Sequence, residues 1–260
     1  MIHLSLNGVP ADAGVPASAL VNYGHFTSLQ VRGGAVQGLH LHLRRLEEAT
    51  RALFGTALDP EAVRGWMRAA LAAAGVGDAS LRVTVFSQRF DFRRPLLPVP
   101  TDVLVAVSAP ARPPAQPWRV RGVVYERDLP EIKHVGTFGA FAQRRQALDA
   151  GFDDALFVTR DGLVSEGTTW NLALLVGATV VWPQAPRLHG VTAQLLRGEL
   201  GPDEARAVTV SELDGVQGAI ACNATGIWPL GGIDGRELPG SGAFCRRARQ
   251  ALAAVPSEPL

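Results

Sequence analysis

Residues 109–117 are the stretch that most constrains the fold, because four of these nine residues are prolines. Proline fixes its own φ angle and restricts the residue before it, so this composition favours an extended, stiff connector over a helix or a central strand. The sequence therefore predicts a first domain at residues 1–108 and a second at residues 118–260, with 109–117 as the linker.

The first domain mixes alternating and helical patterns. Gly33 and Gly34 predict a tight hairpin turn after a strand at residues 26–31. The run at 103–107 is apolar without interruption, which is typical of a strand buried on both faces. Further elements are expected as a strand at 81–86, a helix at 39–53 ended by Gly55, and a helix at 60–74 that Asp59 caps and Gly75 ends.

The second domain also alternates between strands and helices, so the fold class is predicted to be α/β (α+β). Asp161-Gly162 predicts a tight turn into a strand that carries Glu166. Strands are expected at residues 118–125, 153–158, 170–176, 179–182 and 218–222, and helices at 137–150, 191–200 and 242–255.

Charge and composition exclude several classes of partner. The formal net charge is +1, so nothing indicates a nucleic-acid or membrane-surface partner. Cys222 and Cys245 are too few for a disulfide framework. The N-terminus lacks the pattern of a signal peptide, and no apolar run approaches the roughly 20 residues of a membrane span. A soluble, cytoplasmic protein is expected.

Lys133 is the residue around which the second half is organised. It lies between Ile132 and the small and apolar run 135–139, neighbours that favour burial. Burial lowers the pKa of a lysine and frees its amine as a nucleophile. A lysine that keeps its amine in water beside a helix start is the alternative.

Two further patterns follow in the order expected of one known family. Gly162, Glu166, Gly167 and Asn171 match G-x-x-x-E-G-x-x-x-N, and a Leu-x-Gly-Val-Thr turn ends at Thr192. With Lys133 before them, these stretches resemble the class IV, or fold-type IV, pyridoxal-phosphate aminotransferases, which include branched-chain and D-amino-acid aminotransferases and aminodeoxychorismate lyase. Taken alone, Glu166 also fits a surface acid beside a turn.

The resemblance implies a cofactor, pyridoxal 5′-phosphate, in the cleft between two domains. Lys133 would form the Schiff base and move the proton during catalysis, and Glu166 would contact the ring nitrogen. Asn171 would belong to the same cofactor site. Members of this family are commonly homodimers, so a homodimer is expected as well.

The cofactor phosphate needs several donors. His42-Leu43-Arg44-Arg45-Leu46 is similar to the family motif H-L-x-R-L, which assigns the phosphate to Arg45. The amides of Val191 and Thr192 at a helix start, the Thr192 hydroxyl and Thr225 would add donors. The alternative for Arg45 is an exposed helix arginine paired with Glu47 or Glu48.

The family contains two reactions. The pattern of the Glu166 and Thr192 stretches favours ping-pong transamination between an amino acid or amine and a 2-keto acid. Gly24-His25-Phe26-Thr27-Ser28 is similar to the G-x-F-T-T of aminodeoxychorismate lyases, which release pyruvate and 4-aminobenzoate. Phe26, Thr27 and Ser28 are the substrate candidates.

The substrate carboxylate is harder to assign. Amino-acid-specific members often bind it through an arginine on the strand that corresponds to residues 82–86, where apolar residues stand at the expected place. Arg89 or Arg32 could substitute.

Two alternatives of other classes stay open. His40 and His42 could bind a metal together with His25 or Glu47, as in a metal hydrolase, although no metal site is expected because both histidines enter a helix. A non-catalytic protein that keeps the fold for ligand binding is the second alternative.

Overall fold

The computed structural model describes residues 3–10 and 22–260, and its contacts divide the chain into two compact units. Unit 1 comprises Met1–Ala111, Ile132–Gly136 and Ser257–Leu260, and unit 2 comprises Arg112–Glu131 and Thr137–Pro256. The expected domain boundaries stay a prediction. The segment that carries Lys133, Ile132–Gly136, groups with unit 1, although the residues before and after it in sequence belong to unit 2.

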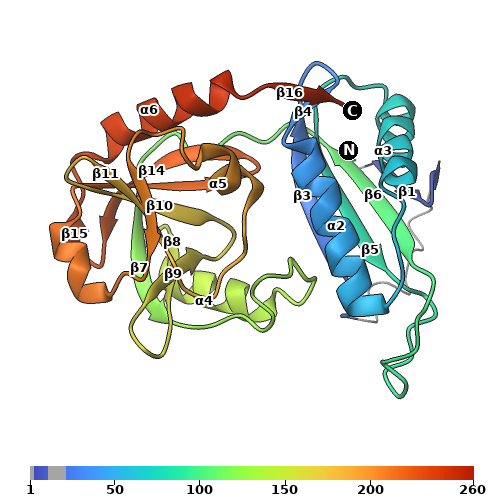
Figure 1. Ribbon diagram of the computed structural model, residues 1–260, viewed down its shortest axis with the longest axis horizontal. Coiled ribbons are helices and arrows are strands. Elements are labelled where there is room, and N and C mark those ends of the chain that lie inside the picture. Colours follow the sequence, from blue (N-terminus) through green and yellow to red (C-terminus); the bar gives the residue numbers. More distant parts are fainter. Residues whose placement is uncertain (1–2, 11–21) are drawn as a thin grey trace. The chain divides into compact units, whose positions relative to one another are not determined.

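In residues 3–10 and 22–111, unit 1 shows a five-stranded antiparallel sheet, in the order β2-β1-β6-β5-β3, with two helices (Figure 1). A short pair, β4 with β16, joins the C-terminus to the hairpin. The elements are β1 His3–Leu6, β2 Val9–Pro10, β3 His25–Val31, β4 Ala35–Gln37, α2 Leu39–Phe54, α3 Pro60–Ala74, β5 Ala79–Phe86, β6 Asp102–Ser108 and β16 Ser257–Pro259.

The helices of unit 1 begin and end where the sequence predicts. The carboxylate of Asp59 accepts hydrogen bonds from the amides of Glu61 and Ala62, and Gly75 ends α3 with a positive φ of 67°. In the hairpin, Gly33 and Gly34 have φ angles of 55° and 73°, which two-residue turns of this kind require. These expectations are confirmed.

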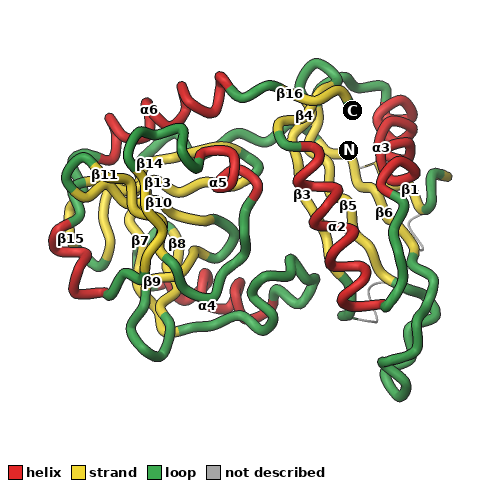
Figure 2. The backbone as a smooth tube through the Cα atoms, viewed as in Figure 1, coloured by secondary structure: helices red, strands yellow, loops and turns green. Residues whose placement is uncertain are grey.

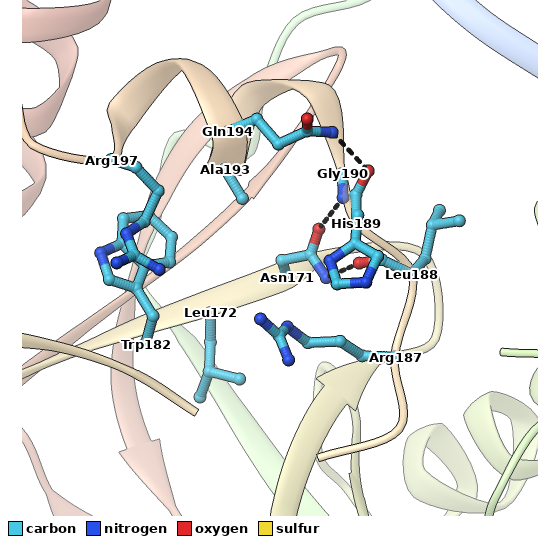
Figure 3. Close-up of a pocket in the computed structure, with 10 residues that line it drawn as sticks. All are labelled: Asn171, Leu172, Trp182, Arg187, Leu188, His189, Gly190, Ala193, Gln194 and Arg197. Carbon is cyan, nitrogen blue, oxygen red and sulfur yellow. Dashed lines mark hydrogen bonds between the residues drawn. The ribbon is translucent and has the colours of Figure 1, made fainter. Parts of the chain in front are cut away.

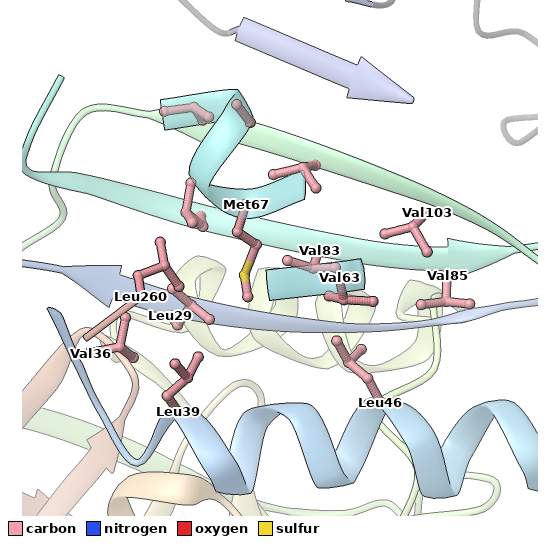
Figure 4. Close-up of a cluster of buried hydrophobic side chains, with 14 of the residues drawn as sticks. Leu29, Val36, Leu39, Leu46, Val63, Met67, Val83, Val85, Val103 and Leu260 are labelled. Carbon is pink, nitrogen blue, oxygen red and sulfur yellow. The ribbon is translucent and has the colours of Figure 1, made fainter. Parts of the chain in front are cut away.

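The core of unit 1 lies between the helices and one face of the sheet. Leu46 of α2 and Met67 of α3 pack in one cluster with Leu29, Val83 and Val103 of the strands (Figure 4). Both helices pack into this one cluster, so β6 is not buried on both faces as predicted: Val103, Val105 and Val107 are buried, whereas the residues between them are half-buried. The expectation of full burial was wrong because an apolar run does not say how many faces are covered.

Unit 2 contains a nine-stranded mixed sheet (Figures 1 and 2). Its main path runs β12-β11-β10-β13-β14-β7-β8-β9, with β15 beside β14, and the pairs β11–β12, β14–β7 and β7–β8 are parallel. The strands are β7 Trp118–Val124, β8 Asp154–Val158, β9 Val164–Gly167, β10 Asn171–Val176, β11 Thr179–Pro183, β12 Asp203–Arg206, β13 Gly218–Asn223, β14 Gly226–Ile233 and β15 Arg236–Glu237.

Three α-helices and one 3-10 helix complete unit 2: α4 Phe138–Asp149, α5 Val191–Leu196, η1 Val210–Gly215 and α6 Ser241–Ala254. Phe244 and Cys245 of α6 pack against Ile227 and Ile220 of the sheet. The predicted helix at 191–200 is shorter than expected, because Arg197 is extended and Gly198 takes a φ of 79°. No helix within residues 3–10 and 22–260 is both long and apolar enough to cross a membrane.

Candidate active site

Lys133 is the only lysine in the sequence, among 25 lysines and arginines in total. Its carbonyl oxygen accepts a hydrogen bond from the amide of Phe26 at 2.9 Å, so the segment lies beside β3. The side chain is half-buried, and its Nζ atom lies 4.8 Å from the centroid of the Phe26 ring. The backbone and an aromatic face thus position the amine. That the sequence contains a single lysine is a further signal for Lys133, which the motifs alone do not reveal.

A second cation contacts the same ring. The Cζ atom of Arg82 lies 3.5 Å from the Phe26 centroid, a cation–π contact. Phe26 and Arg82 lie on the face of β3 and β5 opposite to the core side chains, because successive side chains of a strand alternate in direction and Ser28, two residues after Phe26, pairs with Arg82. Partial removal from water lowers the pKa of Arg82. The search for a carboxylate-binding arginine on this strand overlooked Arg82 itself.

The other two substrate candidates, Thr27 and Ser28, lie on opposite faces of β3. Ser28 shares the face of Phe26 and is half-buried. Thr27 is fully buried on the opposite face, where its hydroxyl lies 2.7 Å from Nδ1 of His42 on α2. Burial lowers the pKa of His42 well below its usual value, and the charges of Arg45 and Lys133 act in the same direction. Thr27 therefore contacts the helix that carries Arg45.

Arg45 is half-buried on α2 and is not part of the ion pairs of that helix. Arg44 pairs with Glu48 at 3.9 Å and Arg51 pairs with Glu47 at 2.8 Å. Among the residues that the structure describes, no carboxylate lies within 4.0 Å of the Arg45 guanidinium, so the alternative of an ion-paired surface arginine is wrong. Burial lowers the pKa of Arg45 to about 10. This is a charge that the described part of the chain leaves without a counter-ion.

Glu166 lies in β9 with 5% of its surface exposed. Arg127 donates from Nε to one carboxylate oxygen at 2.9 Å, and the amide of Leu188 donates to the other at 3.1 Å. Arg127 is itself held by the carbonyl of Pro130. The surface-acid alternative is therefore wrong: both oxygens of Glu166 are fixed in direction inside unit 2.

The glycine after Glu166 has a packing reason. A Cβ atom at Gly167 would overlap the indole ring of Trp170, which is buried in the core of unit 2. The Glu-Gly pair of the motif thus combines a buried, hydrogen-bonded carboxylate with space for an aromatic ring.

Asn171 holds the loop that precedes α5. Its Oδ1 accepts a hydrogen bond from the amide of Gly190 at 3.1 Å, and its Nδ2 donates to the carbonyl of Leu188 at 2.8 Å (Figure 3). A side chain at position 190 would overlap Asn171. Asn171 therefore positions the loop that also donates to Glu166.

The predicted phosphate donors of unit 2 are linked through Asn223. The Thr192 hydroxyl donates to the carbonyl of Asn223 at 2.8 Å, and the amide of Thr225 donates to the Asn223 side chain at 2.8 Å. The start of α5, with Val191, is thereby fixed beside the turn after β13. Because the Thr192 hydroxyl already has an acceptor, its backbone amide is the better candidate donor to a ligand.

Within each unit, then, the structure brings several predicted residues together. Unit 1 places Lys133 and Phe26 beside each other, and unit 2 connects Glu166, Asn171, Thr192 and Thr225 through two short loops. Sequence reasoning did not find Arg127, because it lies 39 residues before Glu166 and nothing in the spacing marks it.

The histidines of the metal-site alternative have separate partners. His40 is exposed and contacts Glu258 at 2.7 Å, His42 contacts Thr27, and His25 contacts Thr50 at 3.0 Å. Within the described ranges, no three His, Cys, Asp or Glu side chains are grouped as metal ligands would be.

Two comparisons of the amino-acid sequence with known proteins were informative to different degrees. A family model described as amino-transferase class IV matches residues 24–233. No curated protein sequence matches the chain.

Three solved structures illustrate the structural likeness. A hypothetical aminotransferase from Mycobacterium tuberculosis, in a PLP-bound form, is 21% identical, with 98% of this chain and 99% of that chain covered and a TM-score of 0.79. The branched-chain aminotransferase of the thermophilic archaeon Thermoproteus uzoniensis, solved with norvaline, is 20% identical, with coverages of 96% and 95% and a TM-score of 0.85. A fold IV transaminase from Curtobacterium pusillum is 22% identical, with 97% of both chains covered and a TM-score of 0.80. These likenesses show the fold-type IV fold.

Proposed function

The chain belongs to the class IV aminotransferase family, and we propose that it is a pyridoxal-phosphate-dependent aminotransferase. In this proposal it transfers an amino group between an amino acid or amine and a 2-keto acid in a ping-pong reaction. The observation that supports the proposal is Lys133, the single lysine of the sequence, which the motif resemblance assigns to the position of the family's catalytic lysine.

The residues of the chain fit the cofactor. Arg45 supports the fit most directly, because a half-buried guanidinium without a carboxylate partner among the described residues suits a phosphate group. The backbone amides of Val191 and Thr192 are the proposed further donors, with Thr225 in the linked turn. Pyridoxal phosphate, when bound, supplies an electron sink for the reacting carbon.

Lys133 is proposed to do the proton transfer. Its Nζ atom, held near the face of Phe26, would hold the cofactor between turnovers and, once released, carry the proton to and from the substrate carbon. Anchoring the backbone of Lys133 to β3 limits the positions that this amine reaches.

Glu166 is proposed to contact the ring nitrogen of the cofactor. Its two oxygens are held by Arg127 and by the Leu188 amide, so little reorganisation is needed when charge develops during the reaction. Asn171 supports this arrangement by holding the same loop.

Arg82, with Phe26 and Ser28 on the same face, is the proposed site for the substrate carboxylate. The guanidinium has no carboxylate within 4.0 Å in the described part of the chain, and a fork of N–H donors binds carboxylates well. We also propose a homodimer, as is common in this family, which sedimentation of the purified protein tests.

The test is an activity screen with a matched variant. Wild-type protein with pyridoxal phosphate is expected to convert 2-keto acids to amino acids with a panel of amino donors, and Lys133→Ala is expected to lose about 10²–10⁴-fold in rate. Release of pyruvate and 4-aminobenzoate from aminodeoxychorismate, without amino transfer, would replace the proposal by the lyase. A Lys133→Ala variant as active as the wild type would refute a catalytic role.

A further inference from the structure

A pocket in unit 2 borders the loop that the proposed cofactor site uses, since Asn171, Leu188 and Gly190 are among its lining residues. It is formed by β10, β11, α5 and the loop before α5 (Figure 3). Leu172, Trp182 and Ala193 supply apolar surface, and Arg187, His189 and Gln194 supply polar groups. A pocket of mixed character, with a few polar groups beside apolar ones, is typical of sites for small organic molecules.

Arg187 is the charged group that the pocket leaves uncompensated. Its guanidinium donates to the carbonyl of Ala185 at 3.2 Å, and among residues 3–10 and 22–260 no carboxylate lies within 4.0 Å of it. Burial lowers the pKa of Arg187, and the more distant charge of Glu166 partly opposes this effect. The second arginine of the pocket, Arg197, is in contrast paired with Asp203 at 2.9 Å.

The loop that carries Arg187 separates two environments. The amide of Leu188 donates to Glu166, on the side assigned to the cofactor. In Figure 3 the side chain of Arg187 extends toward Leu172, whereas the side chain of Leu188 points away from the Arg187 guanidinium. The side chain of Arg187 therefore lines the pocket, while the backbone amide of its neighbour Leu188 contacts Glu166.

We propose that this pocket binds a small carboxylate with a short apolar chain. The Arg187 guanidinium would hold the carboxylate through two parallel hydrogen bonds, and Gln194 would donate from the rim. The apolar chain would pack on Leu172 and on the ring of Trp182. An inorganic phosphate would satisfy Arg187 but would leave this apolar half without contacts, so a carboxylate is the better ligand.

The test follows the indole N–H signal of Trp182 in ¹H–¹⁵N spectra of the full-length protein, with Trp182→Phe to assign the signal. Titration with butyrate is expected to shift it saturably, and Arg187→Gln is expected to weaken the binding roughly tenfold or more, because a charge-assisted hydrogen bond is lost. Arg82→Gln, which changes the proposed substrate site, is expected to leave the titration unchanged. The signal requires no catalytic turnover, so the outcome is independent of the proposed function.

Two further arms make the result decisive. Ala193→Leu keeps Arg187 but fills the pocket. This variant is expected to abolish the butyrate-induced shift of the Trp182 signal, while its thermal unfolding stays cooperative. Inorganic phosphate is expected to bind more weakly than butyrate. A missing butyrate shift, an unchanged titration in both pocket variants, or stronger binding of phosphate than of butyrate would each overturn the proposal.

Discussion

Glu166 of unit 2 is buried and Arg45 of unit 1 is half-buried, and the described residues pair the charge of Glu166 but not that of Arg45. Each oxygen of Glu166 receives a hydrogen bond, from Arg127 and from the Leu188 amide. Arg45 has no counter-ion among the described residues, and burial lowers its pKa to about 10. Arg82 likewise has no counter-ion among the described residues, and burial lowers its pKa.

On the proposed function, the difference separates a group that the fold itself pairs, Glu166, from groups that a ligand would pair, Arg45 and Arg82. An uncompensated charge away from water costs folding free energy, so it persists where binding requires it. In unit 1 the uncompensated groups are cations, which fits a phosphate and a carboxylate as ligands. In unit 2 the carboxylate is held in a fixed direction, which fits a contact that must be in place before the reaction starts.

Among the charged groups compared, the largest effect is expected at Glu166. Glu166→Gln keeps the size of the side chain but removes the charge, and the rate of amino transfer is expected to fall about 10²–10³-fold, as for loss of one electrostatic contact to a reacting group. Steady-state kinetics with saturating cofactor measure it. Glu204→Gln, at the exposed residue of β12, is the control. A rate within about twofold of the wild type would contradict the role of Glu166.

Acid is expected to destabilise unit 1 before unit 2. Burial lowers the pKa of His25 from 6.5 to about 4, so its neutral form stabilises the fold fully above pH 6.5 and the contribution is lost as the pH falls through 4. His42 shifts in the same direction. The loss from His25 alone is about 3 kcal/mol in the free energy of unfolding.

Hydrogen exchange read by mass spectrometry between pH 7 and pH 4 resolves the two units. Peptides of β3 and α2 are expected to lose protection first, after correction for the intrinsic pH dependence of exchange. His189 of unit 2 is exposed, so His189→Gln is expected to leave the pattern unchanged. Simultaneous loss of protection in both units would contradict the assignment to His25 and His42.

Arg45→Gln is expected to weaken pyridoxal phosphate binding roughly tenfold to a hundredfold, because a charged hydrogen-bond donor to the phosphate is lost. The free energy of unfolding without cofactor is expected to stay the same or to rise, since an uncompensated charge is removed. Arg44→Gln, the exposed neighbour on the same helix, is the matched control for both measurements. Lower stability with unchanged cofactor affinity would show that Arg45 is structural.

The smallest effect is expected at Arg82, which stays partly in water. Arg82→Gln is expected to raise KM for amino acids about threefold to tenfold, as for an ion contact of about 1 kcal/mol, and to leave KM for amines without a carboxylate unchanged. Arg89→Gln is the comparison, because the sequence made Arg89, like Arg32, a candidate for binding the substrate carboxylate. An equal rise in KM for both kinds of substrate would rule out recognition of the carboxylate.

Local signals in the sequence explain most of the elements. Asp59, Pro60 and Gly75 mark both ends of α3, and Gly33-Gly34 marks the hairpin, because caps and turns are decided within a few residues. The strand that carries Glu166 follows from the turn at Gly162 for the same reason.

Contacts between distant residues were not predictable in this way. Arg127 reaches Glu166 across 39 residues, and Lys133 pairs with β3, which precedes it by more than 100 residues in the sequence. The stacking of Arg82 on Phe26 depends on the register of β3 and β5, which no local pattern specifies. Covered faces are equally non-local, which is why β6 was expected to be more buried than it is.

The most direct test of the account is to locate the cofactor on the chain. Protein incubated with pyridoxal phosphate, reduced with borohydride and digested should carry one pyridoxyl group per chain on the peptide that contains Lys133, and Lys133→Ala should carry none there. Because the sequence has no other lysine, the N-terminal amine is the only competing primary amine. Label at the N-terminus alone, or an unlabelled Lys133 at saturating cofactor, would contradict the central claim.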